Sequence, residues 1–466
     1  MLLNTLARCY ELSRNQWLKE TELQKLQEKR LRAIVKHAYE NVPLFRRKFD
    51  RAGLKPTSVQ GLEDLTKLPL TTKQEIRAGI PHESISKKQD FNEYLCVSTS
   101  GTSGGPMPVF YDDRFMEYSV ANWYFRKYNA IGIKPWEKVM RVEYSMPEPT
   151  VLHGKKKEEN HEFKPRSITR TALGTTSYGL LQRRQATVYI KHGGEDVLPQ
   201  IVKFKPSLLR ANSSYLRLIA ETMADRGISL NPKAVRTSGE VTDESAREYL
   251  ESAFGCKVFD EYSTWDSGHG AWQCKKREGY HVDADFLIME ILRNGEPAAP
   301  GEHGEIVVTG LLNYAMPLIR YRVGDVGIMD DEKCSCGRGF PLLKSIEGRI
   351  VDCFTLPNGT SVPPKVLMNV VQGTHGVSKY QVVQESRNKF TVCLMRKEND
   401  PDVSIKELTA NLQEVLGHDV EIEVFVGGRE NLKAKFRPVI SKPTVEDELR
   451  WAKPHGALTQ PEQETL

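Results

Sequence analysis

The residues best suited to chemistry form a short run rich in hydroxyl groups and glycine, Ser98-Thr99-Ser100-Gly101-Thr102-Ser103-Gly104-Gly105-Pro106. Glycine lets backbone N–H groups approach an anion closely, and the Ser and Thr hydroxyls add further donors. No Lys-Ser/Thr pair follows the glycines and no helical pattern begins there, so this is not a Walker A loop. Apolar residues flank the run, which predicts a strand–loop–strand hairpin. On composition alone, an anion-binding loop and a flexible turn both remain open.

Three cysteines and one histidine form a second set with chemical potential. Cys274 and His281 precede two predicted strands, and Cys334 and Cys336 follow them. Three thiolates and an imidazole suit a closed, structural Zn²⁺ site. The Cys-x-Cys spacing is tighter than the usual zinc spacing, so free thiols are the alternative, and His269 is a substitute ligand. The remaining cysteines are predicted to be ordinary buried thiols: Cys9, Cys96, Cys256, Cys353 and Cys393.

The composition describes a soluble globular protein of two or three domains. The chain has 466 residues, of which 39% are hydrophobic and 27% charged, with a net charge of +5. No apolar run approaches the ~18 residues of a spanning helix, and no signal-peptide pattern opens the chain. We therefore expect a cytoplasmic protein whose cysteines are thiols or metal ligands, and nucleic-acid binding is disfavoured.

The elements that must position these residues follow from periodicity. A helical pattern covers residues 16–50 and is interrupted at Asn41-Val42-Pro43, and Thr72 is a predicted N-cap. Residues 113–130 are predicted to form an aromatic-rich amphipathic helix. From Lys138 to about residue 265, short apolar runs alternate with helical ones, which indicates βαβ units and a mainly parallel sheet.

The pattern changes near residue 280. We predict an α/β protein with a large N-terminal domain, residues 1–347, whose part at about 280–346 is a β-rich subdomain. A small α+β domain at 348–442 follows, and then a polar tail at 443–466.

Taken in order, several segments resemble motifs of the adenylate-forming (acyl-CoA synthetase-like) superfamily, and its phenylacetate–CoA ligase-like branch in particular. The resemblance covers roughly residues 20 to 442 and includes two segments typical of that branch, 31–43 and 313–322. The remaining motifs are Ser98–Pro106, Thr237–Glu240, Asp260–Asp266, Tyr321–Asp325, Gly348–Asp352 and Ala434–Arg437.

The resemblance implies ATP and Mg²⁺ as cofactors. The opening loop becomes the clamp on the β- and γ-phosphates, and Tyr262 stacks on adenine, although a core aromatic is its alternative role. Asp325 binds the ribose hydroxyls, unless it is a simple turn aspartate, and Arg349 faces the ribose or phosphates. The full ATP set that the resemblance implies is Ser98, Thr99, Ser100, Gly101, Thr102, Ser103, Gly104, Ser238, Gly239, Glu240, Glu261, Tyr262, Ser263, Asp325 and Arg349.

The catalytic residues implied are Lys435 and Asp266. Lys435 would bridge the carboxylate and the α-phosphate during adenylation, Asp266 would hold Mg²⁺, and Asp352 would be the hinge of the C-terminal domain. The chain departs from the family pattern at three positions. Asp266 replaces the usual Glu, Ser263 replaces Gly, and Ala434 replaces the Gly before the lysine.

The implied reaction is the attack of a carboxylic acid on ATP to give an acyl-adenylate and pyrophosphate, followed by transfer of the acyl group to coenzyme A. Transfer to an amine or a carrier thiol is the alternative, and a non-catalytic nucleotide-binding relative is a hypothesis of another class. We expect no nucleic-acid or membrane partner, and a monomer or homodimer. The acyl pocket is expected to favour an aromatic or bulky acid, unless its aromatic side chains belong to the core. The pocket residues are Trp123, Tyr124, Tyr144, Ser214 and Trp265.

Overall fold

The chain divides into two compact units. The first comprises Met1–Glu290, Ile306–Val323 and Ile328–Ile346, and the second comprises Ile291–Glu305, Gly324–Gly327 and Glu347–Leu466. The computed structural model describes residues 2–98, 107–144, 166–167, 184–190, 194–264, 266–350, 353–358, 361–375, 377–396, 404–426 and 439–441.

The first unit begins with helices α1 (Leu2–Asn15), α2 (Glu20–Asn41) and α3 (Pro43–Arg51). Val42 separates the last two and is extended, because the residue before a proline avoids helical backbone angles. Thr72 caps α4 as predicted, since its hydroxyl accepts a hydrogen bond from the Glu75 amide. Short 3-10 turns lie between α3 and α4: η1 (Pro56–Ser58) and η2 (Leu62–Lys67), followed by α4 (Lys73–Ala78) and η3 (Phe91–Glu93).

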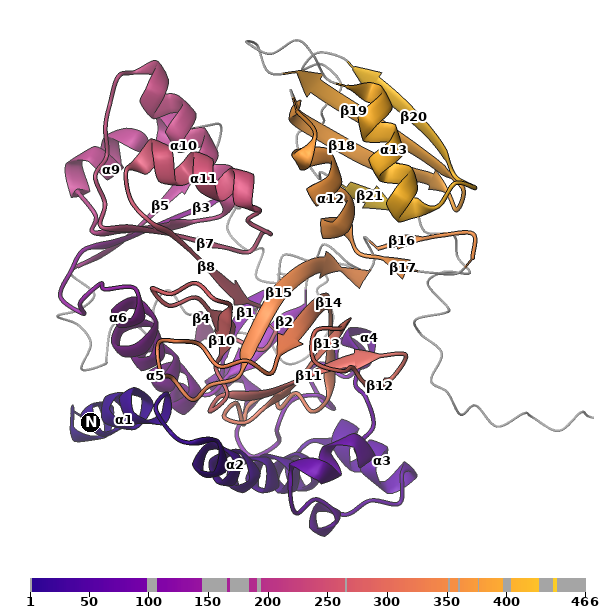
Figure 1. The fold of residues 1–466 in the computed structure, drawn as a ribbon. Helices are drawn as coiled ribbons and strands as arrows, with labels where there is room; N and C mark the ends of the chain where they lie inside the picture. The colour runs from indigo at the N-terminus through magenta and orange to yellow at the C-terminus, as the bar shows by residue number, and fades with distance from the viewer. Residues whose placement is uncertain are drawn as a thin grey trace, which may run out of the picture. The chain divides into compact units, whose positions relative to one another are not determined.

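A run of five parallel strands forms the centre of this unit, in the order β5-β3-β6-β7-β8 (Figure 1). This arrangement confirms the predicted mainly parallel sheet. The strands are β3 (Val139–Tyr144), β5 (Gln185–Ile190), β6 (Leu208–Ala211), β7 (Ala234–Ser238) and β8 (Val258–Ser263).

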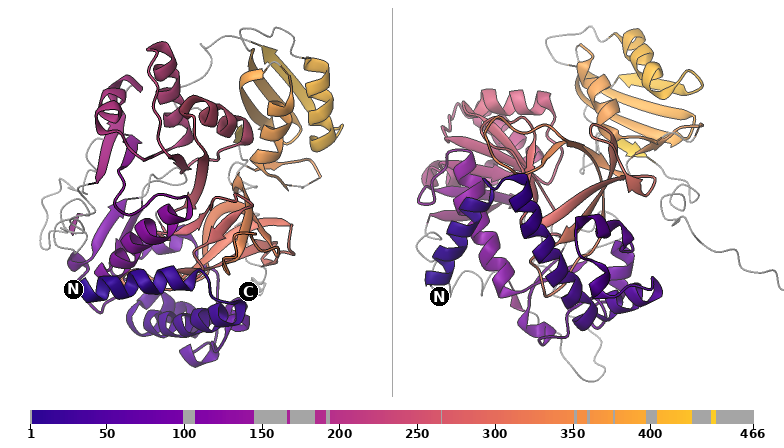
Figure 2. Two further views of the ribbon diagram at one scale, coloured as in Figure 1. Left: turned by 60° about the vertical axis from the view of Figure 1, so that its left-hand side comes forward. Right: turned by 60° about the horizontal axis from the view of Figure 1, so that its bottom comes forward.

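Helices cover both faces of the parallel strands. Apolar residues of β3, β6, β7 and β8 pack on one face against three helices, which the views of Figures 1 and 2 display above the sheet. The opposite face packs against the segment predicted as one aromatic-rich helix. The first set is α9 (Leu198–Phe204), α10 (Ser213–Asp225) and α11 (Glu244–Phe254), which follow the 3-10 turn η5 (Gly194–Asp196). The second is α5 (Asp113–Ala121), η4 (Asn122–Lys127) and α6 (Tyr128–Ala130).

Among the described residues, the sheet continues beyond β8 in the order β9-β10-β15-β14-β13-β11-β12. Strands β11, β13, β14 and β15 have residues in both units. The bounds are β9 (Gly270–Trp272), β10 (Tyr280–Val282), β11 (Leu287–Arg293), β12 (Glu296–Pro297), β13 (His303–Gly310), β14 (Tyr321–Asp330) and β15 (Leu342–Arg349). A separate small sheet holds β1 (Leu95–Ser98), β2 (Pro108–Tyr111) and β4 (Arg166–Ser167).

The second unit has its own apolar core, centred on Phe354, Val382 and Phe390. Its sheet has the order β20-β19-β18-β21, and two helices pack against each other and against this core. The α+β character that the sequence indicates is therefore present. The elements are β16 (Phe354–Thr355), β17 (Ser361–Val362), α12 (Pro364–Gly373), β18 (Val377–Ser386), β19 (Lys389–Arg396), α13 (Ile405–Leu416), β20 (Glu421–Val426) and β21 (Val439–Ser441).

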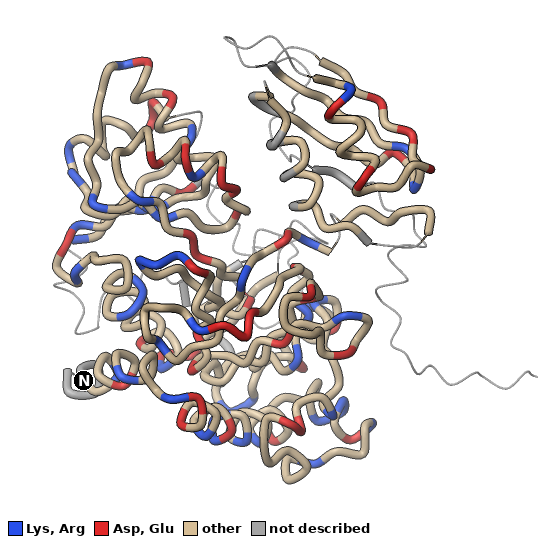
Figure 3. The backbone as a smooth tube through the Cα atoms, viewed as in Figure 1, with Lys and Arg blue, Asp and Glu red and all other residues tan. Residues whose placement is uncertain are grey.

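Acidic and basic positions are interspersed along the described backbone of both units (Figure 3). This mixture is typical of a solvated surface and agrees with the small net charge of the chain. Within the described part of the chain, no helix is long and apolar enough to cross a membrane.

Candidate active site

The hydroxyl-rich run joins two strands. β1 and β2 pair in antiparallel register, with Val97 opposite Val109, so the predicted hairpin is confirmed. Ser98 ends β1, and Thr99, Ser100, Gly101, Thr102, Ser103 and Gly104 lie outside the described residues.

The two segments proposed for adenine lie on neighbouring strands. Ser238 ends β7 and is the register partner of Glu261, which precedes Tyr262 and Ser263 at the end of β8. Gly239 follows with φ +81°, and a Cβ there would stand 3.3 Å from Asn212 Oδ1. Glycine is favoured because the backbone makes a left-handed turn beside another segment.

Two predicted site residues from different segments contact each other. The Glu240 carboxylate accepts hydrogen bonds from the Ser214 amide (2.9 Å) and the Ser214 hydroxyl (2.8 Å). Ser214 is in the first turn of α10, whose N-cap residue Asn212 makes no side-chain cap. Glu240 therefore supplies the cap and fixes the start of α10 beside the end of β7.

Asp266 is buried, and the sequence did not reveal its partners. Its Oδ2 accepts a hydrogen bond from the Tyr321 hydroxyl (2.6 Å) and lies 3.6 Å from Lys73 Nζ. Its Oδ1 makes no hydrogen bond with any residue that the structure describes, which leaves a ligand position on an ionisable carboxylate. Trp265, the neighbouring pocket residue, lies outside the described part of the chain.

The aromatic segment of the predicted acyl pocket contains a π-helical turn, η4. The turn carries Trp123 and Tyr124; Tyr124 packs edge-on against Tyr128 at 5.7 Å, and the Trp123 ring lies 6.2 Å from that of His269. Burial raises the pKa of Tyr124. Tyr144 ends β3, and its side chain is outside the described set.

The same π-helical turn places two cations in the interior. Arg126 contacts Asp283 and Asp285, and Lys127 Nζ lies 2.8 Å from Glu261 and 2.9 Å from Asp283. All of these side chains are fully buried. Burial alone would raise the pKa of Asp283, but Lys127 and His269 lower it far below its ordinary value. We call Arg126, Lys127, Asp283 and Asp285 the aspartate cluster.

The remaining nucleotide-site candidates belong to the second unit or are not described. Asp325 lies in β14 and Arg349 ends β15, both within the second unit. The hinge candidate Asp352 and the lysine Lys435 lie outside the described residues. Their roles stay predictions.

The four residues of the predicted metal site converge. Their ligand atoms lie within 4.8 Å of one another, with Cys274 Sγ 3.7 Å from Cys334 Sγ and Cys336 Sγ 3.4 Å from His281 Nε2. Tetrahedral zinc with Zn–S bonds of about 2.3 Å separates its sulfur atoms by about 3.8 Å. Burial alone would raise the pKa of Cys336, but hydrogen bonds from His281 and the Arg338 amide lower it to about 5. The geometry fits a zinc ion.

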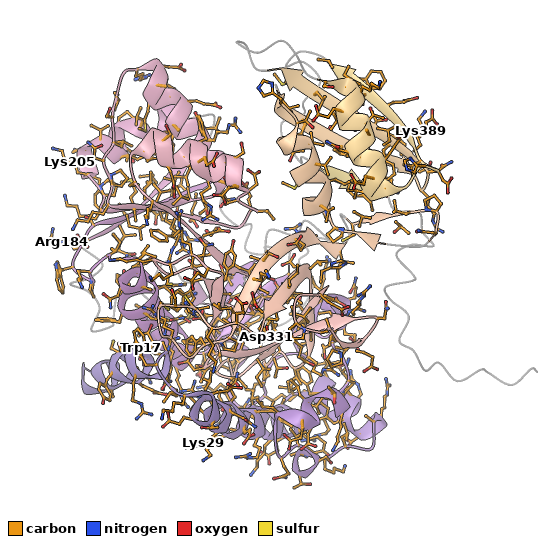
Figure 4. The ribbon with its side chains drawn as sticks, in the orientation of Figure 1. Trp17, Lys29, Arg184, Lys205, Asp331 and Lys389 are labelled. Atoms are coloured by element: carbon orange, nitrogen blue, oxygen red, sulfur yellow. The ribbon has the colours of Figure 1, made fainter. Side chains whose placement is uncertain are left out.

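The loop that carries two of these cysteines is also held by the connection between α1 and α2. The Arg338 guanidinium lies 4.7 Å from the centre of the Trp17 ring, which Figure 4 labels, and its Nε donates to Gln16 Oε1. The Gly339 amide donates to the Gln16 carbonyl, and a Cβ on Gly339 would clash with the Leu18 carbonyl. The four-residue site therefore links β9, β10 and the N-terminal helices.

Solved structures of known proteins share this fold. The chain superposes on 2-hydroxyisobutyryl-CoA ligase in the postadenylation state with a TM-score of 0.73, covering 94% of each chain at 20% sequence identity. An open conformation of the same ligase gives a TM-score of 0.64 at 20% identity. The chain thus shares its fold with this ligase.

Relatives in sequence show the family to which the chain belongs. The chain is 30% identical over 372 residues to the phenylacetate–coenzyme A ligase of Escherichia coli K12, covering 78% of this chain and 79% of that protein. It is 26% identical to the corresponding ligase of Aromatoleum evansii, covering 88% and 89%. A scan against protein-family models finds no match. The chain belongs to the phenylacetate–coenzyme A ligase family.

Proposed function

We propose that this protein uses ATP to convert a carboxylic acid into an acyl-adenylate with release of pyrophosphate, and then transfers the acyl group to coenzyme A. The observation that carries the proposal is the 30% identity to a phenylacetate–coenzyme A ligase over almost four fifths of both chains. Transfer to an amine or a carrier thiol is the alternative, and the identity of the product distinguishes the acceptors.

The described residues support the first step. Ser238, Gly239 and Tyr262 would form the adenine slot at adjacent strand ends, which is where ligands bind to open parallel sheets. Asp266 would hold Mg²⁺, which supplies positive charge against the phosphates; its Oδ1 is available and Tyr321 fixes its orientation. Asp325 would bind the ribose, and Lys435 would offset the charge that develops between the carboxylate and the α-phosphate. The domain at 348–442 would turn about Asp352.

Isotope exchange between pyrophosphate and ATP tests this proposal, because only reversible adenylate formation produces it. We expect exchange that depends on a carboxylic acid, and a loss of roughly 100-fold or more in Lys435→Ala. Lys29→Ala is the matched control, since Lys29 is an exposed residue of α2 (Figure 4). An unchanged exchange rate in Lys435→Ala overturns the role of the lysine. ATP binding without exchange, whatever the acid, overturns the activation step.

We also propose that Cys274, His281, Cys334 and Cys336 hold a structural Zn²⁺. All four tetrahedral positions would be filled by protein ligands, so the ion would fix the fold and take no part in the reaction. Metal analysis of the purified protein should find one zinc per chain, a depleted content in Cys336→Ser and full content in Cys256→Ser. A protein that lacks stoichiometric zinc would refute this assignment.

A further inference from the structure

A cavity of about 360 Å³ opens at the edge of the parallel sheet where its strands begin. Lys233 precedes β7 and Lys257 precedes β8, and because these strands are parallel, both lysines lie at the same edge. A third lysine, Lys275, lies in the connection between β9 and β10. We call this space the lysine cavity. Half of its lining residues are these lysines, and the other half are uncharged: Ile131, Gly132 and Phe259.

The backbone around the lysine cavity positions two of its lysines. Lys257 and Phe259 share one face of β8, because side chains alternate along a strand, and the Phe259 side chain is 3% exposed. Gly132 has φ +91°, and a Cβ there would stand 2.9 Å from Lys275 Cε and 3.0 Å from Lys275 Nζ. Glycine therefore leaves room for the Lys275 ammonium group beside the loop that follows α6. Lys275 also follows Cys274, which the four-residue metal site holds in place.

Within the described part of the chain, one carboxylate contacts a lysine of the cavity. Glu137 Oε1 forms an ion pair with Lys233, and Glu137 Oε2 accepts a hydrogen bond from the Lys134 amide (2.7 Å). Burial alone would raise the pKa of Glu137, but the hydrogen bonds from Lys233 and the Lys134 amide lower it. Glu137 is therefore ionised and both of its oxygens are engaged, so that it matches the charge of Lys233 alone.

The carboxylates on neighbouring elements are engaged elsewhere. Glu251 of α11 pairs with Arg277, and Glu278 accepts hydrogen bonds from the Ser335 amide (2.7 Å) and the Ser335 hydroxyl (2.5 Å). Among the described residues, the other two lysines of the cavity therefore have no ion-pair partner. Two ammonium groups thus face a cavity whose remaining lining is uncharged, which is an arrangement suited to an anion.

The lysine cavity is separate from the proposed nucleotide site. Ser238 ends β7 and Tyr262 lies near the end of β8, whereas Lys233 and Lys257 stand immediately before the two strands. A strand rises about 3.3 Å per residue, so the backbone from Lys257 to Tyr262 spans about 17 Å. A small ligand in the lysine cavity therefore does not occupy the adenine slot at the opposite edge of the sheet.

We propose that the lysine cavity binds a phosphate monoester, as a second anion site outside the reaction centre. A phosphate monoester carries about 1.5 to 2 negative charges at neutral pH, which matches the two ammonium groups of Lys257 and Lys275. Lysine binds phosphate as a point charge, and each ammonium group offers several N–H donors to the phosphate oxygens. The apolar side chains of Ile131 and Phe259 would contact the organic group of the ester. The inference is independent of the proposed function.

Calorimetric titration of the whole protein with phenyl phosphate tests the inference. We expect the unmodified protein to bind phenyl phosphate, and to bind the singly charged phenyl sulfate more weakly. Lys257→Gln and Lys275→Gln should each weaken the binding of phenyl phosphate by roughly tenfold or more, because each removes a charged hydrogen-bond donor. Lys276→Gln is the matched control: Lys276 is an exposed neighbour of Lys275 that does not line the cavity, so this variant should bind as the unmodified protein does.

Vesicles of phosphatidylcholine with and without phosphatidic acid distinguish the two sources of such a phosphate. Sedimentation with the phosphatidic acid vesicles that is lost in Lys257→Gln and Lys275→Gln identifies a lipid headgroup, and binding of phenyl phosphate alone identifies a soluble ester. Failure of the unmodified protein to bind either probe overturns the inference without any variant. Equal binding in all four proteins also overturns it, because the phosphate is then held elsewhere. Neither result bears on acid activation, which pyrophosphate exchange measures separately.

Discussion

Two buried polar clusters meet near the β9–β10 hairpin, and they differ in whether their charges are matched. The aspartate cluster pairs Asp283 and Asp285 with Arg126 and Lys127, and every one of these side chains is fully buried. The second cluster, Cys274, His281, Cys334 and Cys336, brings the ligand atoms of three cysteines and a histidine within 4.8 Å of one another. A cluster whose charges are paired is complete and serves the fold, whereas a set of convergent ligand atoms calls for a bound ion.

Removing one charge from the aspartate cluster should have the largest effect on stability. Asp283→Asn leaves Lys127 and Arg126 short of one negative charge in the interior, and removal of one partner from a buried pair costs about 3–5 kcal/mol. Urea unfolding should report this loss. The same change in the exposed pair Arg293–Glu302, Glu302→Gln, should cost less than about 1 kcal/mol. Equal losses of unfolding free energy in Asp283→Asn and Glu302→Gln would contradict the distinction between buried and exposed ion pairs.

Removing the proposed zinc ion from Cys274, His281, Cys334 and Cys336 should have the next largest effect on stability. A ligand present at about 100 times its dissociation constant stabilises the folded state by roughly 3 kcal/mol. Chelation should therefore lower the free energy of unfolding by about this amount in the unmodified protein and in Cys256→Ser. Cys336→Ser should already be destabilised and should not respond to the chelator. A uniform response in all three proteins would show that the chelator acts elsewhere.

The ion pair between Asp64 and the exposed Lys67 should have the smallest effect and a defined pH dependence. A hydrogen bond from Lys67 and the amides of Gln60 and Gly61 lower the pKa of Asp64 from 3.8 to about 2. A lowered carboxyl pKa stabilises the fold above about pH 4, and this contribution disappears as the pH falls toward 2. The difference in unfolding free energy between the unmodified protein and Asp64→Asn should thus shrink from pH 5 to pH 3. A constant difference would exclude this electrostatic origin.

Local signals predicted most of the fold. Thr72 caps α4, and Val42-Pro43 separates α2 from α3. The alternation predicted after Lys138 corresponds to β3, β5, β6, β7 and β8 with their helices. The helix predicted at 113–130 is present, but its π-helical turn was missed, because periodicity does not reveal a local change of helix type. Helix α1 was not predicted. Its contacts include a hydrogen bond from the Arg126 guanidinium to the Leu12 carbonyl, a tertiary interaction that local periodicity does not reveal.

The candidate site was predictable to a lesser degree. Ligand chemistry identified Cys274, His281, Cys334 and Cys336, which the fold brings together although Cys274 and Cys334 are 60 residues apart in sequence. Lys233, Lys257 and Lys275 carried no signal, because only the starts of adjacent strands and a connecting loop make them neighbours. Lys73 and Tyr321 were likewise hidden until the fold placed them at Asp266. Interactions that depend on strand register and on packing cannot be inferred from the local spacing of residues in the sequence.

One measurement tests the central claim most directly: identification by mass spectrometry of the products formed from ATP, coenzyme A and a panel of mono- and dicarboxylic acids. The account predicts AMP, pyrophosphate and an acyl-CoA thioester. AMP with an amide formed from an added amine would keep the activation step and change the acceptor. ADP and phosphate as products, or no consumption of ATP with any acid, would contradict the account.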